Sequence, residues 1–269
     1  MRNLPWLIAH RGAMAEAPEN VEAAFDAAFS HEVDGVELDV QMTADNVPVV
    51  FHDDTLKRIT GKKGSVPDYP FAVLQEFDYG AWHSEAFRGQ GIMTLESMLH
   101  KYAGRGAMMI ELKSGSGIQE PSKYCSRLCR EVTRLITFKV PEHLLKEIFI
   151  LGFDTDMIAE AWQLAPQLKY MLNVKKPLNP EKQNETIHGM LWGYCLPLRK
   201  LSRQFCRKCH ARDQRIAVYS CNFPDEVSYA LNAGADVVMT DDPANTAGAF
   251  QKDMIYLAKN DILGKNKHG

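Results

Sequence analysis

The stretch Gly35-Val36-Glu37-Leu38-Asp39-Val40 decides how the rest of this chain is interpreted. Its alternation predicts a short strand with Glu37 and Asp39 on one face and the apolar side chains on the other. Two carboxylates held close together on a strand repel one another and are costly to bury unpaired. A hard divalent cation with oxygen ligands would remove that cost, whereas a half-exposed strand would leave both acids facing water. The stretch alone leaves both interpretations open.

Strands and helices alternate around this stretch. An apolar run over residues 6–9 ends at His10, and apolar residues then repeat at helical spacing after Asn20, a candidate helix N-cap. Strand, helix, strand in this order favours a parallel sheet. The next strand, residues 47–51, follows too soon for a parallel crossover. It either returns as an extended segment or pairs as a hairpin.

The alternation resumes at Thr94, a predicted N-cap, and continues through helices such as residues 199–210 to a last helix over residues 243–257. It predicts an α/β fold, a (β/α)8 barrel of the triosephosphate-isomerase type, as one domain over residues 1–269. Nine candidate strands give one too many, and we place the surplus near residues 37–52 or near the end. The alternative, a doubly wound open sheet, lacks the glycine-rich motif after its first strand.

Residues 54–92 interrupt the alternation of strands and helices and contain many glycines, prolines and aromatic residues. A stretch this long with little regular structure inside a compact fold is usually functional. We predict a small inserted subdomain after the third strand, over the mouth of the barrel.

The composition excludes several classes of function. The chain has 269 residues, a net charge of −3 and no basic block, which argues against a nucleic-acid partner. No apolar run is long enough for stable membrane insertion. The first strand begins almost at the N-terminus, and six cysteines in a chain of this length are not a disulfide scaffold. We therefore expect a cytoplasmic protein with reduced thiols.

Ionisable residues stand at the ends of four predicted strands, where a barrel of this type builds its active site. Glu37, Asp39 and Glu111 predict a site for a hard cation, Mg²⁺ or Ca²⁺. Arg11 offers a fork that matches a phosphate, and Lys113 a point charge beside it.

Two histidines complete this group. His10 and His52, at different strand ends, suit a general acid and a general base. The alternative is a structural role, with both histidines buried and hydrogen-bonded. Taken together, the residues at the strand ends indicate metal-assisted phosphoester chemistry.

The order and spacing of these motifs resemble the glycerophosphodiester phosphodiesterase family, of the phosphatidylinositol phospholipase C-like superfamily. The matching motifs are His10-Arg11-Gly12, Pro18-Glu19-Asn20, Glu37-x-Asp39, Val49-Val50-Phe51-His52-Asp53, Glu111-x-Lys113, and Gly234-Ala235-Asp236 with Thr240-Asp241. The resemblance implies a barrel with an insertion after its third strand. It implies hydrolysis of a small-molecule glycerophosphodiester to sn-glycerol 3-phosphate and an alcohol.

The resemblance also implies roles for residues. His10 and His52 would be the acid–base pair, Glu37, Asp39 and Glu111 the metal ligands. Arg11 and Lys113 would hold the phosphate. Either water or the neighbouring glycerol hydroxyl would attack, the latter through a cyclic phosphate.

The chain departs from the family near its end, where members often carry a tryptophan and this sequence has Tyr219. Tyr219 still offers an aromatic wall and adds a hydroxyl, so the change bears on substrate preference. Phe153, after another strand, either lines the pocket or belongs to the core.

Other interpretations remain open. The same barrel would serve a phosphodiesterase that acts on a phosphoinositide or sphingomyelin-like lipid, with Phe71, Trp82 and Phe87 as a membrane-facing patch. A phosphate-ligand binder without turnover is the non-enzymatic alternative. The alcohol, the metal and the oligomeric state, a homo-oligomer included, cannot be read from the sequence.

Two cysteine patterns compete with this interpretation. Cys206-Arg207-Lys208-Cys209-His210 matches the spacing of a c-type haem attachment site, but that chemistry needs export. Cys125 and Cys129 stand one helical turn apart, and a zinc site shared with the other pair would need two separate helices to be adjacent. We expect neither.

Overall fold

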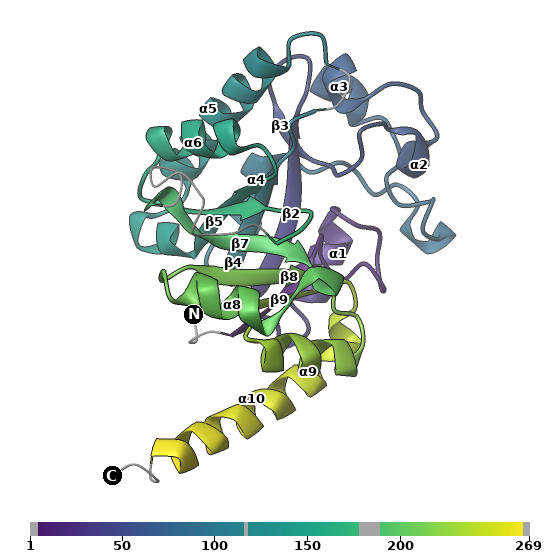
Figure 1. Ribbon diagram of the computed structural model, residues 1–269. Coiled ribbons are helices and arrows are strands. Elements are labelled where there is room, and N and C mark those ends of the chain that lie inside the picture. The colour runs from purple at the N-terminus through teal and green to yellow at the C-terminus, as the bar shows by residue number, and fades with distance from the viewer. Residues whose placement is uncertain (1–4, 116–117, 178–188, 266–269) are drawn as a thin grey trace.

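The computed structural model describes residues 5–115, 118–177 and 189–265, and for residues 260–265 it describes the backbone alone. Within these residues nine strands form one sheet (Figure 1). Eight run parallel, and pairing of β1 with β2 closes them into a barrel. The predicted barrel is confirmed. The strands are β1 (Trp6–His10), β2 (Gly35–Met42), β3 (Pro48–Val50), β4 (Ala107–Leu112), β5 (Ile148–Gly152), β6 (Lys169–Asn173), β7 (Leu191–Pro197), β8 (Arg215–Tyr219) and β9 (Val237–Thr240).

Helices follow most of the parallel strands and cover the outside of the barrel (Figure 1). The α-helices are α1 (Glu22–Ala28), α2 (Lys57–Thr60), α3 (Phe71–Leu74), α4 (Leu95–Tyr102), α5 (Pro121–Lys139), α6 (Thr155–Leu164), α8 (Arg203–His210), α9 (Pro224–Ala233) and α10 (Pro243–Lys265). Short 3-10 helices are η1 (Val66–Asp68), η2 (Glu85–Phe87), η3 (Glu142–Glu147) and η5 (Leu198–Lys200). In α5, Leu128, Val132 and Leu135 recur at helical spacing and are buried against the barrel.

The surplus strand is β3. It pairs antiparallel with β2, with Val40 opposite Val50 and Met42 opposite Pro48, so the short connection forms a hairpin. This hairpin settles the question that the sequence left open. It also brings the chain back to the mouth of the barrel, where His52 follows β3.

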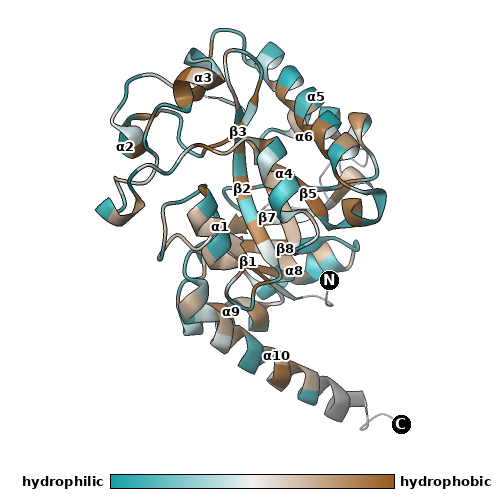
Figure 2. Cartoon of the chain, turned by 180° about the vertical axis from the view of Figure 1, so that it is seen from behind, coloured by the Kyte–Doolittle hydropathy of each residue, from teal (hydrophilic) through white to brown (hydrophobic). Residues whose placement is uncertain are grey.

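The two faces of β2 lie in different environments, as its alternation predicts. Val36, Leu38 and Val40 belong to the large core between barrel and helices. Glu37 and Asp39 point into the barrel, whose interior core includes Ile8, Met109, Leu151 and Met239 from other strands of the barrel. Both faces of β2 are buried. Figure 2 shows the teal and brown bands that alternate along this strand.

Aromatic residues close the barrel at the amino ends of its strands. Trp6 stacks on Trp192, with ring centroids 5.9 Å apart, and Phe149 meets Trp192 edge-on at 4.9 Å. These residues stand at or near the starts of β1, β7 and β5. Because this end is filled by packed rings, the interior of the barrel opens toward the carboxyl ends, where the acids lie.

The segment between β3 and α4 contains α2, η1, α3 and η2 and has a hydrophobic cluster of its own. Phe51, Leu56, Ile59, Leu74 and Tyr79 are among its buried members. In Figure 1 α2 and α3 lie beside the barrel, beyond β3.

Several element boundaries differ from prediction, and the cap expected at Thr94 is found. Thr94 caps α4 by accepting from the Ser97 backbone, and Gly234 ends α9 with a φ of 100°. Asn20, in contrast, is not a helix cap, because its side chain bonds to Asp39 instead. The predicted helix over residues 199–210 divides into η5 and α8 because Ser202 caps α8. The last helix continues to Lys265, beyond the predicted end.

Candidate active site

The register of the parallel strands brings the three predicted metal ligands together. Asp39 of β2 lies opposite Glu111 of β4, and Glu37 lies opposite His10 of β1. One carboxylate oxygen from each of Glu37, Asp39 and Glu111 lies within 4.8 Å of the others. Glu37 is 2% exposed and Asp39 is 1% exposed. These side chains therefore form one three-carboxylate cluster, with Glu37 and Asp39 buried and Glu111 partly exposed, at the open end of the barrel.

The charges of this cluster are only partly balanced by the protein. Burial, together with Asp39 and Glu111, raises the pKa of Glu37 well above its ordinary value. Burial also raises the pKa of Glu111, with Asp39 adding to the effect. For Asp39 burial acts in the same direction, but Arg11 and Lys113 outweigh it and lower the pKa. The cluster thus holds more negative charge than its cations neutralise, and a hard divalent cation fits this donor set.

Arg11 and Lys113 stand beside the carboxylates, at the positions where phosphate ligands were predicted. The Arg11 guanidinium donates to Glu19 at 3.0 Å, and its Nε lies 3.2 Å from Asp39 Oδ2. Lys113 Nζ donates to Glu111 at 2.8 Å and lies 3.4 Å from Asp39. Both cations line the cavity described below, so their charges reach any anion bound there.

Each predicted catalytic histidine is held by an aspartate. His10 Nδ1 lies 2.6 Å from Asp241 Oδ1, and His52 Nδ1 lies 2.8 Å from Asp53 Oδ1. A carboxylate at Nδ1 keeps a proton on that nitrogen and leaves Nε2 to exchange protons. The Nε2 atom of His10 lies 3.8 Å from Glu37. Neither histidine is a fully buried core residue.

A second group at this mouth is already neutralised. Glu19, His52 and Asp53 also place possible ligand atoms within 4.8 Å of one another. Arg58 donates to Glu19 at 2.8 Å and to Asp53 at 2.6 Å, and Arg11 donates to Glu19 as well. Because arginines occupy these acids, this group is a weaker cation site than the three-carboxylate cluster.

The sequence interpretation missed the residues that support the site. Asn20 donates to Asp39 at 2.9 Å, and Asn173, at the end of β6, donates to Glu111 at 2.8 Å. The Oδ1 atom of Asn173 is buried and has no hydrogen-bond partner among the described residues. Asp53 and Asp241 lie inside motifs already singled out, so their position beside strand-end histidines was the available signal. Asn173 carried the same signal, a polar residue at a strand end.

These residues surround one cavity of about 170 Å³. Phe153 is 42% exposed at its rim, which excludes the core position that the sequence left open. Tyr219 forms part of the wall and stacks on His10, with ring centroids 6.2 Å apart. The lining residues are His10, Arg11, Glu37, His52, Glu111, Lys113, Leu151, Phe153, Asn173, Cys195, Tyr219 and Met239.

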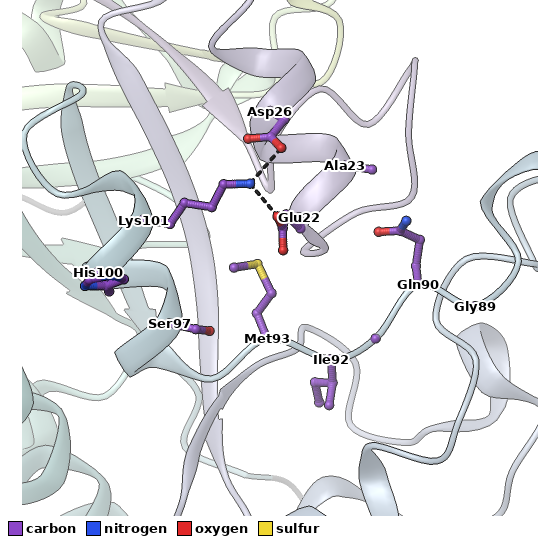
Figure 3. Close-up of a pocket in the computed structure, with 11 residues that line it drawn as sticks. Glu22, Ala23, Asp26, Gly89, Gln90, Ile92, Met93, Ser97, His100 and Lys101 are labelled. Carbon is purple, nitrogen blue, oxygen red and sulfur yellow. Dashed lines mark hydrogen bonds and ion pairs between the residues drawn. The ribbon is translucent and has the colours of Figure 1, made fainter.

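A larger hollow, of about 820 Å³, lies on the outside of the barrel between α1, α4 and residues 89–93 (Figure 3). Its most prominent charges already pair with each other, because the Lys101 ammonium binds both Glu22 and Asp26. The dashed lines in Figure 3 mark these two contacts. This hollow does not contain His10, His52 or the three-carboxylate cluster, so the smaller cavity is the candidate active site.

The four cysteines of the competing patterns are packed in the large core. Burial raises the pKa of Cys206 to about 11 and that of Cys209 to about 12. Such thiols are poor nucleophiles, and haem cannot reach them. None of the helices in the described ranges combines the length and the apolar character that a bilayer crossing demands.

Proteins of similar sequence are described as glycerophosphodiester phosphodiesterases. A family model for the glycerophosphoryl diester phosphodiesterase family matches residues 10–245. The glycerophosphodiester phosphodiesterase of Caldanaerobacter subterraneus subsp. tengcongensis is 26% identical over 257 residues, covering 91% of this chain and 98% of that relative. YhdW of Bacillus subtilis is 47% identical over 118 residues, covering 43% of this chain and 49% of that relative. That second match spans about half the relative's length.

Solved structures share the fold. A phosphodiesterase of Oleispira antarctica, in complex with its product sn-glycerol-3-phosphate, superposes with a TM-score of 0.82 at 24% identity, covering 93% of this chain and 97% of that one. A glycerophosphodiester phosphodiesterase of Agrobacterium tumefaciens gives a TM-score of 0.76 at 24% identity, covering 92% and 99%. At this identity the similarity supports the barrel, and the family match confirms the resemblance seen in the motifs. The chain belongs to the glycerophosphoryl diester phosphodiesterase family of phosphoric diester hydrolases.

Proposed function

We propose that this chain hydrolyses small, water-soluble glycerophosphodiesters to sn-glycerol 3-phosphate and an alcohol, using a divalent cation and a pair of histidines. The proposal rests on one observation. The three-carboxylate cluster, the side chains of Arg11 and Lys113, and two histidines held by aspartates all lie around one cavity. Hydrolysis of a phosphodiester needs three functions that these groups can supply: charge neutralisation, binding of the phosphate and proton transfer.

Glu37, Asp39 and Glu111 are the proposed ligands of the cation, Mg²⁺ or Ca²⁺. The family typically uses a divalent cation. The raised pKa of Glu37 and the unmatched Oδ1 of buried Asn173 support a positively charged or hydrogen-bonding occupant next to them. When bound, the cation would act as a Lewis acid that neutralises charge on the phosphoryl oxygens.

The remaining groups bind the phosphate and move protons. Arg11 and Lys113 hold the phosphoryl oxygens by charge-assisted hydrogen bonds. Nε2 of one histidine takes the proton from the attacking oxygen, and the Nε2–H of the other gives a proton to the leaving alcohol. The attacking oxygen belongs either to water or to the neighbouring glycerol hydroxyl. The side chains of His10 and His52 suit both routes. In the cyclic route the two histidines exchange roles when water opens the ring, which restores both. After direct attack by water they return to their starting protonation states by exchanging protons with solvent.

The observations favour a soluble diester over a lipid. The Trp82 indole donates to the Tyr79 carbonyl at 2.9 Å and lies under the Arg58 guanidinium at 5.1 Å. Phe87 packs edge-on against His83 at 5.4 Å, and Phe71 is only partly exposed. Trp82 is 37% exposed, and all three aromatics make contacts within their own segment, which favours a structural role over a membrane-facing patch.

A cytoplasmic location is also proposed. All six cysteines are unpaired and buried, which suits a reducing compartment. Fractionation of the native cells, with an antibody against the chain, tests this location. Recovery outside the cytoplasmic fraction would contradict it.

A product analysis tests the proposed activity. The purified chain with Mg²⁺ or Ca²⁺ is incubated with glycerophosphocholine, glycerophosphoethanolamine and glycerophosphoserine, and the products are separated. The proposal expects sn-glycerol 3-phosphate and the free alcohol from at least one diester. Release of glycerol and a phosphorylated alcohol, or no hydrolysis of any diester with either metal, would overturn it.

A further inference from the structure

A second cavity adjoins the candidate active site. It has a volume of about 480 Å³ and lies where β7 and β8 end, with Pro197 opposite Tyr219 in the register of these strands. Its lining residues are Leu198, Arg199, Tyr219, Ser220, Glu226 and Tyr229. None of these except Tyr219 lines the candidate active site, so the mechanism above leaves this cavity without a role.

Tyr219 is the wall that the two cavities share. On one side its ring stacks on His10, a histidine that the mechanism needs. A phosphodiester held by Arg11 and Lys113 has two ester arms, and one of them must extend away from the glycerol end. The arm that passes Tyr219 enters the second cavity. This cavity is therefore placed to hold the part of the substrate that leaves as an alcohol.

The two charged side chains of the second cavity, Glu226 and Arg199, differ in the hydrogen bonds that they form within the protein. Glu226 is its acid, and one of its oxygens accepts the backbone N–H groups of Asn222 at 2.7 Å and Phe223 at 3.2 Å. Glu226 thereby closes the start of α9, a local structural task. Arg199 is exposed, and its guanidinium forms no hydrogen bond or ion pair with any described residue. Arg199 is thus the charged side chain of this cavity without a hydrogen bond among the described residues, whereas Glu226 is held at the start of α9 by one of its oxygens.

We infer that the second cavity receives the leaving alcohol and that Arg199 selects an alcohol with an anionic group, a carboxylate or a phosphate. This inference rests on the proposed function and names its substrate class. A guanidinium matches both anions with paired N–H donors. A quaternary ammonium such as choline meets a like charge at Arg199, which disfavours it.

The rings beside Arg199 suit a compact polar group. Tyr229 donates its hydroxyl to the Leu201 carbonyl at 3.1 Å, which fixes its ring. Ser220 donates to Asp241 at 3.2 Å and is turned toward the histidine side. Arg199 is then the lining side chain that is free to reorient toward an incoming anion.

A matched pair of substrates isolates this interaction. Glycerophosphoserine is glycerophosphoethanolamine with one added carboxylate. We compare kcat/KM for the two diesters in the metal-loaded chain, in Arg199→Gln, in Arg199→Lys and in Lys200→Gln. Lys200 is the exposed neighbour of Arg199 and does not line the cavity. Glycerophosphoinositol 4-phosphate is the further substrate, whose alcohol carries a phosphate instead of a carboxylate.

The wild-type chain should prefer glycerophosphoserine or the inositol phosphate diester over glycerophosphoethanolamine. Arg199→Gln should reduce that preference about tenfold, mainly through KM, while the rate on glycerophosphoethanolamine stays within about twofold. Arg199→Lys should retain part of the preference and Lys200→Gln all of it. The preference should also fall as salt is raised, because the arginine is exposed.

The outcomes separate the two proposals. An unchanged preference in Arg199→Gln, or a wild-type preference for glycerophosphocholine, overturns the inference while hydrolysis itself leaves the proposed function standing. Equal losses on both diesters also overturn it, because they indicate a general structural effect. If the wild-type chain hydrolyses no diester, the proposed function fails and the inference with it.

Discussion

Two aspartates outside the three-carboxylate cluster orient the imidazole rings of His10 and His52. Burial raises the pKa of Asp241, but its bonds from His10 and Asn222 outweigh burial and hold the pKa below its ordinary value. The pKa of Asp53 is likewise lowered, since burial is outweighed by His52 and Arg58. Both aspartates are therefore charged at neutral pH and can keep the imidazole rings oriented.

The histidines themselves give the first prediction. His10→Ala and His52→Ala should each lower kcat at least about a hundredfold, because each removes one proton-transfer group. His100→Ala is the matched control, since His100 is exposed on α4, away from the candidate active site. Steady-state release of sn-glycerol 3-phosphate measures the effect. Near-normal kcat in either active-site variant would remove that histidine from the mechanism.

The aspartates give a second, smaller effect. Asp241→Asn and Asp53→Asn keep the shape of the side chain but remove the charge that fixes the Nδ1 proton. We expect kcat to fall at least about tenfold in each, with KM within about twofold. Separate kcat and KM values check this, with thermal unfolding to show that the fold is intact. A change confined to KM would show that the aspartates serve substrate binding instead.

The turn between β1 and α1 links the three-carboxylate cluster to Arg11, the proposed phosphate ligand. Its ends are tied because the Asn20 N–H donates to the Arg11 carbonyl at 3.0 Å. Both residues have left-handed backbone, with φ of 56° at Arg11 and 60° at Asn20. Between them Gly12 lies so close to α1 that a Cβ would come within 2.7 Å of Ala24. The turn thereby holds Arg11 and Asn20 against Asp39.

Two substitutions of Asn20 separate its two tasks. Asn20→Gly keeps the left-handed backbone and removes the bond to Asp39, so metal affinity should fall about tenfold. Asn20→Ala removes the bond and adds backbone strain, so the free energy of unfolding should also fall, by about 1–2 kcal/mol. Calorimetric metal titration and urea unfolding measure the two effects. Equal metal affinity in Asn20→Gly and the wild type would contradict the role given to the bond.

The residues on the parallel strands were predictable, and the residues that support them were not. Parallel strand ends meet at one mouth whatever the register, so Glu37, Asp39 and Glu111 could be grouped from the alternation alone. Asp241, in contrast, is 231 positions from His10 and reaches it only because β9 pairs with β1 as the barrel closes. Asn20 was predicted as a helix cap because its preference for turns serves a cap and a left-handed turn equally.

The barrel as a whole has one sealed end and one working end. The rings of Trp6, Phe149 and Trp192 fill the first, and every group of the mechanism lies at the second. The segment between β3 and α4 is fixed to this working end by Arg58, which bonds to Glu19 and Asp53. That attachment joins α2 to the loop that carries Arg11, and so joins the segment to the site.

Removing this attachment should weaken the whole molecule. Arg58→Met leaves the buried Glu19 with one arginine instead of two, so the free energy of unfolding should fall by about 1–2 kcal/mol, a moderate loss because Arg58 is partly exposed. Lys57→Met, on the same helix and exposed, is the control. Urea unfolding compares the two variants. If Arg58→Met is as stable as Lys57→Met, the attachment contributes nothing to the fold.

Metal dependence tests the central claim most directly. The purified chain is treated with EDTA, and release of sn-glycerol 3-phosphate from glycerophosphoethanolamine is measured before and after Mg²⁺ or Ca²⁺ is restored. The three-carboxylate cluster predicts at least about a hundredfold loss of rate, reversed by one of the two metals in the wild type but not in Glu37→Gln. A full rate in EDTA would contradict the assignment of Glu37, Asp39 and Glu111 as metal ligands.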